Sequence, residues 1–589
     1  MNSSKNKIIS WLSRAKQALS FWKRSTTSQE AIDRKLIYGL AARKIPTGRQ
    51  LKHLPKFLRS QEYLVVKICL LLILINVIYL GIVFTKSHLQ YTPKAGGEYV
   101  EGIVGYPQTI NPLYAASRDV DGDLTRLIYS SLFVYNQDGN LVNDLVESYT
   151  ISPDNKEYTI KIKNNVRWQN GDSLTADDVV FTFNLIENPD FRSPLRFSFA
   201  GVQASSADSQ TVKFTLSQPY SPFLDLLTFG VLSKNIWGEV DPSSAGLNNL
   251  NLKPVGSGPY QFKSFTRNTA GDLKEYRLVA NNNYYNAKPY IKTIVFKFFP
   301  DYTQAIKALN DNQIDGLSYV PFSSRADILA QNSLSFHELI QPETVAIFFN
   351  KDKNKTLGDK DVRVALAQAI NKDQIINEVF NGVYQRLDGP IIPQSWAYNS
   401  QLKIYDYSLA SATALIVKKP LAVTLTVIDS GQNTAVAQVI KSAWEQAGVK
   451  VSLKIVSSAE APNIIHNHDF EALIYGEAIG GDPDVYAFWH SSQIGSNGLN
   501  LAAYSNADVD KLLVDGRSTV DPSQRLTDYQ KFQSLITADL PVIWLYSPTY
   551  TYVQAKKAQG FSGSVAIRPA DRFASVASWY INTHKKIVW

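Results

Sequence analysis

The chain has 589 residues, 44% of them hydrophobic and 19% charged, which is enough material for two or three cores. Its net charge of +8 is unevenly spread: residues 1–63 hold 14 Lys/Arg against three acids, whereas residues 68–589 hold 45 against 49. The basic character belongs to an N-terminal arm, and the mildly acidic remainder argues against nucleic acid as a partner. The only cysteine, Cys69, excludes an internal disulfide.

The basic arm, residues 1–63, contains one amphipathic candidate helix. In "IISWLSRAKQALSFW" (8–22) the apolar residues recur at helical spacing. Such a helix could lie on the anionic inner leaflet of a membrane, and a solvated basic tail fits the composition equally well. The sequence leaves both interpretations open.

Residues 64–84 predict one transmembrane helix. About 20 apolar residues in a row make a helix of roughly 30 Å, long enough to cross the hydrocarbon core. The long arm before it is unlike a secretory signal, and Cys69 follows Ile68, where a lipidation signal would have a small residue. Because basic segments stay on the cytoplasmic side, we expect a single-pass cell-membrane protein with its N-terminus inside and the body outside. Residues 85–96 read as a linker.

The stretch "WQNGDSLTADDVVFTF" (168–183) predicts a turn and a helix start. Asn170-Gly171 is typical of a tight turn. Thr175 stands three residues before Asp178 and an apolar run follows, which is the pattern of a capping box. Asp177 and Asp178 are therefore expected to cap a helix rather than to carry out chemistry.

The rest of the body predicts a large mixed α/β fold. Apolar or alternating runs predict strands, and patterns with helical spacing predict helices, without repeats or low-complexity tracts. The expected strands are within 157–168, 211–216, 293–299, 421–428, 449–456 and 540–546, and the expected helices are within 361–380, 432–447 (ended by Gly448) and 523–539.

Most candidate reactive motifs have simpler explanations. No glycine-rich phosphate loop is present. "VGSGPY" lacks the spacing of a serine nucleophile elbow, so Ser257 is expected in a turn. "HNHD" (466–469) could hold a metal, but it sits in a polar stretch that favours a solvated loop.

The stretch "GGDPD" (480–484) is the polar cluster with the strongest claim to function. Turn chemistry explains Asp482 and Asp484 beside glycines and a proline. The alternative is an exposed carboxylate pair available to a cationic group of a ligand.

Several blocks resemble the extracellular solute-binding proteins of family 5, the oligopeptide- and dipeptide-binding proteins of ABC importers. They occur in the family's order over about residues 97–560. The blocks include "NLVNDLVESYTISPDNKEYTIKIKNNVRWQNGDSLTADDVVFTF", "INPLY", "VGSGPYQF", "NNNYYNAKPYIKTIVFKFFPD", "NDNQIDGL", "DVRVALAQAINKDQII", "GDPDVYAFW", "YSNADVDKLL" and "LPVIWLY".

The resemblance implies an α/β fold: a two-lobed clamp like that of periplasmic binding proteins, with an extra inserted domain. Here the clamp is preceded by the transmembrane helix. Its expected divisions are lobe I at 97–120, 198–300 and 541–589, the inserted domain at 121–197, and lobe II at 301–540. It also implies a peptide ligand, ABC permease subunits with a cytoplasmic ATPase as partners, a monomer, and no catalytic residue, metal or cofactor.

The resemblance places a ligand in the cleft between the lobes. Peptide binders of the family usually have a Trp shortly before an Asp that pairs with the peptide's α-amino group. Here "YGEAIGGDPD" has Glu477 near the Trp position, and Asp482 is the better placed carboxylate for the amine. The residues expected to contact ligand are Asp482, Asp484, Glu477, Ser117, Ser257, Phe348 and Asn350.

Three other functions compete with peptide import. The same clamp could sense a ligand and signal through the transmembrane helix, although the arm has no recognisable kinase or DNA-binding segment. It could bind nickel, haem or an oligosaccharide, as some relatives do. An extracellular hydrolase would need a nucleophile and an oxyanion or metal arrangement that the sequence does not offer.

Overall fold

The computed structural model describes residue 52, residues 58–495 and residues 498–587. It separates into two compact units, Met1–Gln90 with Lys585–Trp589, and Tyr91–His584. The candidate amphipathic helix at residues 8–22, like nearly all of the basic arm, lies outside the described residues. We call the second unit the body.

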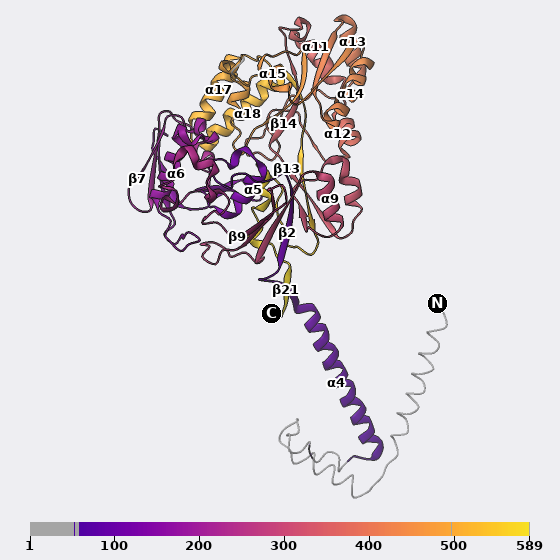
Figure 1. Cartoon of the computed structure of the whole chain (residues 1–589). Helices are drawn as coiled ribbons and strands as arrows, with labels where there is room; N and C mark the ends of the chain where they lie inside the picture. The colour runs from indigo at the N-terminus through magenta and orange to yellow at the C-terminus, as the bar shows by residue number, and fades with distance from the viewer. Residues whose placement is uncertain (1–51, 53–57, 496–497, 588–589) are drawn as a thin grey trace, which may run out of the picture. The chain divides into compact units, whose positions relative to one another are not determined.

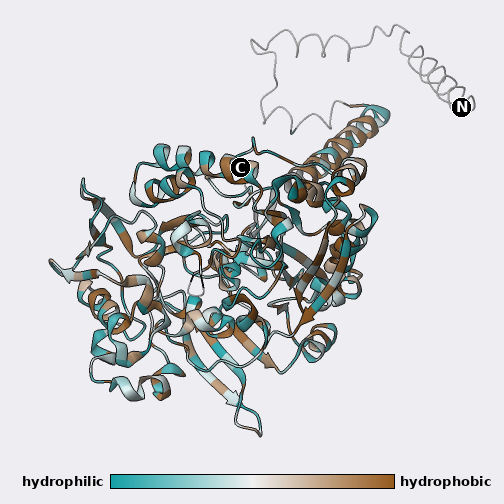
Figure 2. Cartoon of the chain, turned by 90° about the horizontal axis from the view of Figure 1, so that it is seen from above, coloured by the Kyte–Doolittle hydropathy of each residue, from teal (hydrophilic) through white to brown (hydrophobic). Residues whose placement is uncertain are grey.

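The predicted membrane span forms one helix, α4 (Ser60–His88), which extends past residues 64–84 at both ends (Figure 1). Its segment Ser60–Phe84 is long and apolar enough to cross a membrane, and it is not buried inside the protein. Figure 2 shows α4 as largely apolar. The side-chain amide of Asn76 donates a hydrogen bond to the Leu72 carbonyl oxygen at 2.9 Å, which would reduce the cost of this polar group if the helix crosses a membrane.

The segment after α4 is not the irregular linker that its composition suggests. It forms strand β1 (Leu89–Lys94), which pairs with the C-terminal strand β21 (Asn582–Ile587). Within the body, Thr92 Oγ1 lies 3.0 Å from His584 Nε2, although the two residues are 492 positions apart in the sequence. Local composition could not reveal a strand whose partner is so distant.

The first large sheet of the body has seven strands in the order β13-β20-β12-β2-β11-β10-β9. β2 pairs in parallel with β11 and β12, and the other pairs are antiparallel. Its strands are β2 (Glu98–Val104), β9 (Tyr260–Arg267), β10 (Leu273–Ala280), β11 (Thr293–Phe299), β12 (Gly316–Leu317), β13 (Leu334–Ile340) and β20 (Thr549–Ala555).

An antiparallel four-stranded sheet shares a hydrophobic core with the seven-stranded sheet. Its order is β5-β6-β8-β7, and the hairpin β3–β4 stands beside it as a separate pair. We call these sheets and their helices the first lobe. The strands are β3 (Phe133–Tyr135), β4 (Leu141–Asn143), β5 (Val146–Ile151), β6 (Glu157–Ile162), β7 (Val202–Ser206) and β8 (Thr211–Leu216). The helices are α5 (Asp119–Ile128), α6 (Ala176–Glu187), α7 (Phe223–Leu226), α8 (Lys234–Trp237), α9 (Tyr302–Asn310) and α10 (Arg325–Leu329).

The second lobe is built on a six-stranded sheet in the order β15-β19-β14-β18-β16-β17. Two hydrophobic cores cover its two faces, which explains why β14 and β19 are apolar almost throughout. In Figure 1, α11, α12, α13 and α14 lie on one side of β14, and α15, α17 and α18 lie on the other. The strands are β14 (Glu343–Phe349), β15 (Gln385–Arg386), β16 (Ala422–Ile428), β17 (Lys450–Val456), β18 (Ala472–Ala478) and β19 (Val542–Ser547). The helices are α11 (Lys360–Gln368), α12 (Lys372–Phe380), α13 (Leu409–Lys418), α14 (Gly431–Gln446), α15 (Ala461–His466), α16 (Tyr486–Trp489), α17 (Ala507–Ser518) and α18 (Pro522–Asp539).

The chain crosses between the lobes at two adjacent points. It passes from β13 to β14 through Gln341 and Pro342, and from β19 to β20 through Pro548. The Gln341 N–H donates to the Pro548 carbonyl oxygen at 3.3 Å, and the Ser547 hydroxyl donates to the Gln341 carbonyl oxygen at 2.8 Å. Two short crossings held side by side form a hinge between rigid sheets.

The sheets divide the chain differently from the boundaries expected from sequence. β12 and β13 fall in the range expected for lobe II but pair in the seven-stranded sheet, and β19 falls in the expected lobe I but pairs with β14. β7 and β8 extend the four-stranded sheet beyond residue 197. Strand partners are chosen by long-range pairing, so blocks of sequence could not place these boundaries.

The helix expected at 361–380 is two helices, α11 and α12. The break falls at Ala369–Asn371, where the Asn371 side chain caps α12 by accepting from the Gln374 N–H at 3.1 Å. The expected stop at Gly448 is confirmed, with φ of 97°, a conformation that favours glycine.

The predicted start of α6 is confirmed, with Asp178 as its main capping group. One carboxylate oxygen of Asp178 accepts from the Thr175 N–H at 2.9 Å, and the other accepts from the Lys234 N–H at 2.8 Å. The Thr175 hydroxyl lies 3.4 Å from the same carboxylate, so its own contribution is weak. Asp177 is exposed and accepts a hydrogen bond from the Ser206 hydroxyl.

Candidate functional site

The "GGDPD" stretch lies in the loop that follows β18, where the second lobe meets the first. A Cβ atom on Gly481 would stand 2.3 Å from Cε1 of Tyr135, so only glycine allows the two lobes to approach this closely here. The Tyr135 hydroxyl donates to Asp225 Oδ1 at 2.6 Å, both in the first lobe. The loop is therefore part of the interface between the lobes.

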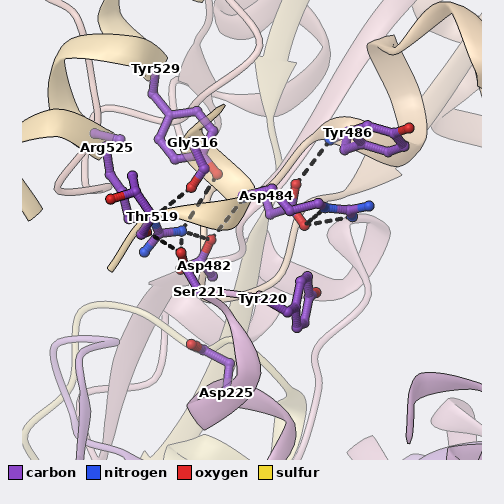
Figure 3. A network of polar contacts seen from close by, with 12 residues as sticks. Tyr220, Ser221, Asp225, Asp482, Asp484, Tyr486, Gly516, Thr519, Arg525 and Tyr529 are labelled. Carbon is purple, nitrogen blue, oxygen red and sulfur yellow. Dashed lines mark hydrogen bonds and ion pairs between the residues drawn. The ribbon is translucent and has the colours of Figure 1, made fainter. Parts of the chain in front are cut away.

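Asp482 is paired with an arginine inside this interface (Figure 3). Arg525 Nη2 lies 2.8 and 2.9 Å from its two carboxylate oxygens, and the two side chains are only 10% and 11% exposed. Burial raises the pKa of Asp482 to about 7, Arg525 opposes this rise, and the neighbouring Asp225 adds to it.

Asp484 has an arginine partner of its own. Arg517 donates from Nε and Nη2 to Asp484 Oδ2 at 2.9 and 2.7 Å. The Arg517 guanidinium carbon also lies over two aromatic rings, 4.1 Å from the ring centre of Tyr486 and 5.4 Å from that of Tyr220 in the first lobe. Of the two explanations left open by the sequence, the exposed carboxylate pair is wrong, because both carboxylates are largely buried and compensated. Turn chemistry fits, since Asp482 accepts from the Asp484 N–H at 3.1 Å and Asp484 from the Tyr486 N–H at 3.2 Å.

Backbone groups add direct hydrogen bonds between the lobes. The Ser221 N–H donates to the Arg517 carbonyl oxygen at 2.8 Å, and the Ser221 hydroxyl donates to that of Thr519. The Asn155 amide donates to the Ser518 carbonyl oxygen at 3.3 Å. These contacts join the C-terminal end of α17 and Thr519 to the first lobe, with the lobes close together.

A pocket lies beside these contacts and next to the hinge. Its empty space, part of it open to solvent, is about 460 Å³. Both lobes supply its apolar walls, namely Ile391, Ile392, Trp396 and Ile479 from the second and Val565 and Ile567 from the first. A concave space between two lobes, with apolar walls and a few polar groups, is a usual form of a small-ligand site.

The pocket also has a polar part. Asp138 and Asn140, at the exposed β3–β4 turn, form one rim, and Gln394 and Ser395 face it from the second lobe. Pro342 of the hinge also lines the pocket. The pocket thus combines a few polar groups with contacts to both sides of the hinge.

Several residues that the sequence predicted to contact ligand are not among those that line this pocket. Phe348 is in the core of the second lobe, stacked with Trp489. Asn350 shapes a turn: its side chain accepts from the Asp352 N–H and donates to the His468 carbonyl oxygen. Ser257 is fully buried against α5, and Ser117 is exposed in a 3-10 turn.

Glu477 is the predicted residue with the most unusual environment. It lies in β18 and is 4% exposed, and its Oε1 atom has no hydrogen-bond partner within the described ranges. Burial raises its pKa well above the ordinary value.

The "HNHD" stretch is the last residue of α15 and the surface turn that follows it. Asp469 pairs with Lys353 at 2.9 Å and Lys454 at 3.6 Å, and His468 adopts a positive φ of 49°. In the part of the chain that the structure describes, no group of three or more potential metal ligands comes together.

Sequence reasoning missed Arg517, Arg525 and Trp396. Arg517 and Arg525 stand 33 and 43 residues from their aspartates, and nothing local marks them. Trp396 lines the pocket and packs against Arg525, with the guanidinium 5.1 Å from its ring.

Two sheet-based lobes joined by a double crossing, with a pocket beside the crossing, define a two-lobed ligand-binding protein. The chain belongs to the bacterial extracellular solute-binding proteins, family 5, whose model (its middle region) matches residues 140–499. The relatives found are binding proteins and not enzymes.

Named relatives and solved structures agree with this family. The chain is 27% identical over 514 residues to the oligopeptide-binding protein AppA of Bacillus subtilis (strain 168), covering 83% of this chain and 92% of AppA. It is 26% identical over 477 residues to the probable D,D-dipeptide-binding periplasmic protein DdpA of Escherichia coli (strain K12), covering 78% and 90%.

The fold is similar to that of AppA from Bacillus subtilis in complex with a nonapeptide, with a TM-score of 0.63 over 83% of this chain and 100% of that one, at 27% identity. It is also similar to the ABC transporter substrate-binding protein CtaP from Listeria monocytogenes, with a TM-score of 0.73 over 83% and 99%, at 26% identity.

Proposed function

We propose that this chain is a membrane-anchored solute-binding subunit of an ABC importer, which captures peptides between its lobes and delivers them to a permease. The observation that carries the proposal is the pocket at the hinge, with walls from both lobes. The names of the relatives, oligopeptide- and dipeptide-binding proteins, support peptide as the ligand.

The geometry suits capture by closure. The lobes can rotate about Gln341–Pro342 and Pro548 without disturbing either sheet. Ligand in the pocket would add contacts on both sides of the hinge and so shift the equilibrium toward the closed form. Asp482 and Asp484, held by their arginines, would fix the loop that forms one wall, and extended peptide backbone would supply further hydrogen bonds.

The membrane part of the proposal rests on α4 and on charge. Residues 1–63 would form a cytoplasmic arm, α4 would span the membrane, and the body would lie outside, because basic segments remain on the cytoplasmic side. A tethered body stays near a permease in the same membrane, which raises its effective concentration there.

Peptide binding is tested by calorimetric titration of the full chain in detergent. The ligands are leucine- and phenylalanine-led peptides of two, three, five and nine residues. Saturable binding of one peptide per chain is expected for at least one length. Absence of binding to the whole set contradicts peptide as the ligand.

Delivery is tested by crosslinking native membranes and identifying what is joined to the chain. ABC permease subunits are expected among the products. Crosslinks to a membrane kinase, with none to a permease, would instead support the sensor function.

A further inference from the structure

Three carboxyl groups and two guanidinium groups, all among the described residues, meet where the two lobes touch (Figure 3). Asp482 of the second lobe is bound by Arg525, at 2.8 Å. Asp484 of the same lobe is bound by Arg517, at 2.7 Å. Asp225, in helix α7 of the first lobe, is the third carboxyl group. With all five groups ionised, this cluster carries one negative charge in excess.

Within the described ranges, Asp225 brings no cation with it from the first lobe. Its carboxylate accepts from the Tyr135 hydroxyl at 2.6 Å, and none of the ion pairs found among the described residues includes it. The cation that acts on it is Arg525 of the second lobe, which already binds Asp482. One guanidinium group therefore faces two carboxyl groups, and it can neutralise only one of them.

Asp225 and Asp482 each favour protonation. Burial raises the pKa of Asp225, against the Tyr135 hydroxyl and Arg525. Burial raises the pKa of Asp482 to about 7, against Arg525, and the charge of Asp225 adds to the rise. Since neighbouring like charges disfavour each other's ionised form, the two groups titrate together, and the first proton bound belongs to the pair.

No other titratable group around the pair, in the described part of the body, supplies the missing positive charge. These groups are Tyr135, Tyr158 and Tyr220 of the first lobe and Asp484, Arg517 and Tyr529 of the second. Burial raises the pKa of all four tyrosines, so their hydroxyl groups stay neutral. Asp484 and Arg517 neutralise each other, and beyond Tyr135 lie Arg568 and Asp571, which have opposite signs.

Opening of the lobes would undo this crowding. Asp225 would leave with the first lobe, and the two aspartate–arginine pairs would remain balanced in the second. A carboxyl group that returns to water regains an ordinary pKa of about 4. Closure brings the third carboxylate back beside a balanced network and removes its water, which favours uptake of one proton from solvent. The closed form then binds a proton more tightly than the open form.

We propose that closure of the lobes takes up one proton at the Asp225–Asp482 pair, so that ligand binding tightens as the pH falls. The inference rests on the proposed function, in which ligand holds the closed form. The proton comes from water and adds to a carboxylate oxygen of the pair, and no other bond changes. A form that binds a proton more tightly is favoured at lower pH. The affinity should therefore rise as the pH falls through about 7, and level off near about pH 4, where the open form is protonated too.

The number of protons taken up is measured by calorimetric titration of the full chain in detergent, at about pH 6. The probe is the tightest-binding of the leucine- and phenylalanine-led peptides. Two buffers that absorb different heats on losing a proton are compared, and the difference in binding heat divided by the difference in buffer heat gives the number of protons. The chains are the unaltered one, Asp225→Asn and Asp144→Asn. Asp144 is the matched control, because it is also a half-buried carboxyl group that accepts a tyrosine hydroxyl, and its donors Tyr285 and Ser131 both lie in the first lobe.

The unaltered chain and Asp144→Asn are each expected to take up about one proton more than Asp225→Asn. The peptide's own change in protonation cancels in this comparison, because the same peptide is used throughout. Between about pH 7.5 and 5.5 the affinity of the unaltered chain should rise about tenfold relative to that of Asp225→Asn. Equal proton uptake by the unaltered chain and Asp225→Asn, or an equal loss of uptake in Asp144→Asn, overturns the inference and leaves peptide binding intact. If no peptide of the set binds the unaltered chain, the proposed function fails and the inference falls with it.

Tyr135→Phe provides a second test that does not remove a carboxyl group. The ring that packs against Gly481 stays, while the hydroxyl that stabilises the ionised Asp225 is lost. Asp225 should then hold its proton to a higher pH, so the midpoint of the pH dependence of affinity should move upward. A purely structural effect would change the affinity equally at every pH. A midpoint that stays in place or moves downward overturns the pair as the site of proton uptake.

Discussion

Asp177 and Asp178 are adjacent residues with different environments. Asp178 is buried and accepts two backbone N–H groups, from Thr175 and Lys234, whereas Asp177 is exposed and meets only the Ser206 hydroxyl among the hydrogen bonds found. Removing a buried acceptor leaves both N–H groups without a partner.

Asp178→Ala is therefore expected to lower the free energy of unfolding by about 1–3 kcal/mol, and Asp177→Ala by no more than about 0.5 kcal/mol. Urea unfolding of the two variants measures both values. Equal effects, or a loss of peptide affinity in Asp178→Ala without a loss of stability, would contradict a capping role.

Glu101 makes a pH prediction possible. It is fully buried with Arg572, whose Nε and Nη2 atoms lie 3.1 and 3.0 Å from its Oε1, yet burial raises its pKa from 4.5 to about 7. The folded state then binds a proton more tightly than the unfolded state. The stability from this group is complete below about pH 4.5 and is lost as the pH rises through about 7.

Glu101→Gln should flatten the dependence of unfolding free energy on pH between about 4.5 and 7, relative to the unaltered chain. Denaturant melts at several pH values measure the slope. An unchanged slope would show that Glu101 stays ionised in the fold, held so by Arg572.

At the residue scale, only local interactions could be predicted from sequence. The capping of α6 involves residues three positions apart, so the pattern itself shows it. The pairing of Asp482 with Arg525 depends on how α18 lies against the loop after β18, and no local pattern contains it. The environment of Glu477 likewise emerges only when β14 and β18 are paired.

At the scale of elements, the C-terminal end of α17 joins the lobes. The Tyr220 ring, from the first lobe, lies 5.4 Å from the Arg517 guanidinium, which also binds Asp484 of its own lobe. Tyr220→Ala removes this contact between lobes without unpairing a buried carboxylate.

The loss of one such cation–π contact, about 1 kcal/mol, should speed peptide release roughly fivefold. Stopped-flow measurement of release checks this, with the exposed Tyr407→Ala in the second lobe as control. An unchanged release rate in Tyr220→Ala would mean that this contact does not hold the closed form.

Elements themselves were predicted better than their boundaries. The strand and helix positions follow from apolar periodicity, but the division of 361–380 into α11 and α12 depends on a cap at Asn371 inside an apolar pattern. The membership of β12, β13 and β19 depends on pairing across 194 to 238 residues, which sequence periodicity does not encode.

At the scale of the whole molecule, the charge distribution predicts topology. With 14 Lys/Arg against three acids before α4, the arm should be cytoplasmic and the body outside. Protease added to intact cells is expected to degrade the body and leave the arm, as antibodies to each part would show. Degradation of the arm from outside would contradict this orientation.

The family and the two-lobed architecture could be predicted because they are encoded in many short motifs spread along the chain. The pocket could not, because its walls come from segments far apart in sequence, such as Asp138, Trp396 and Val565. These segments meet only once the two lobes have formed and the hinge has brought them together.

Hydrogen–deuterium exchange of the full chain, with and without a saturating peptide, tests the central claim most directly. Peptide in the interlobe pocket should slow exchange in the β3–β4 turn, around Trp396 and in the loop after β18, since these segments line the pocket. Slower exchange in segments of both lobes is the predicted result. Peptide binding that leaves these segments unchanged, or protects only other parts of the chain, would contradict the account.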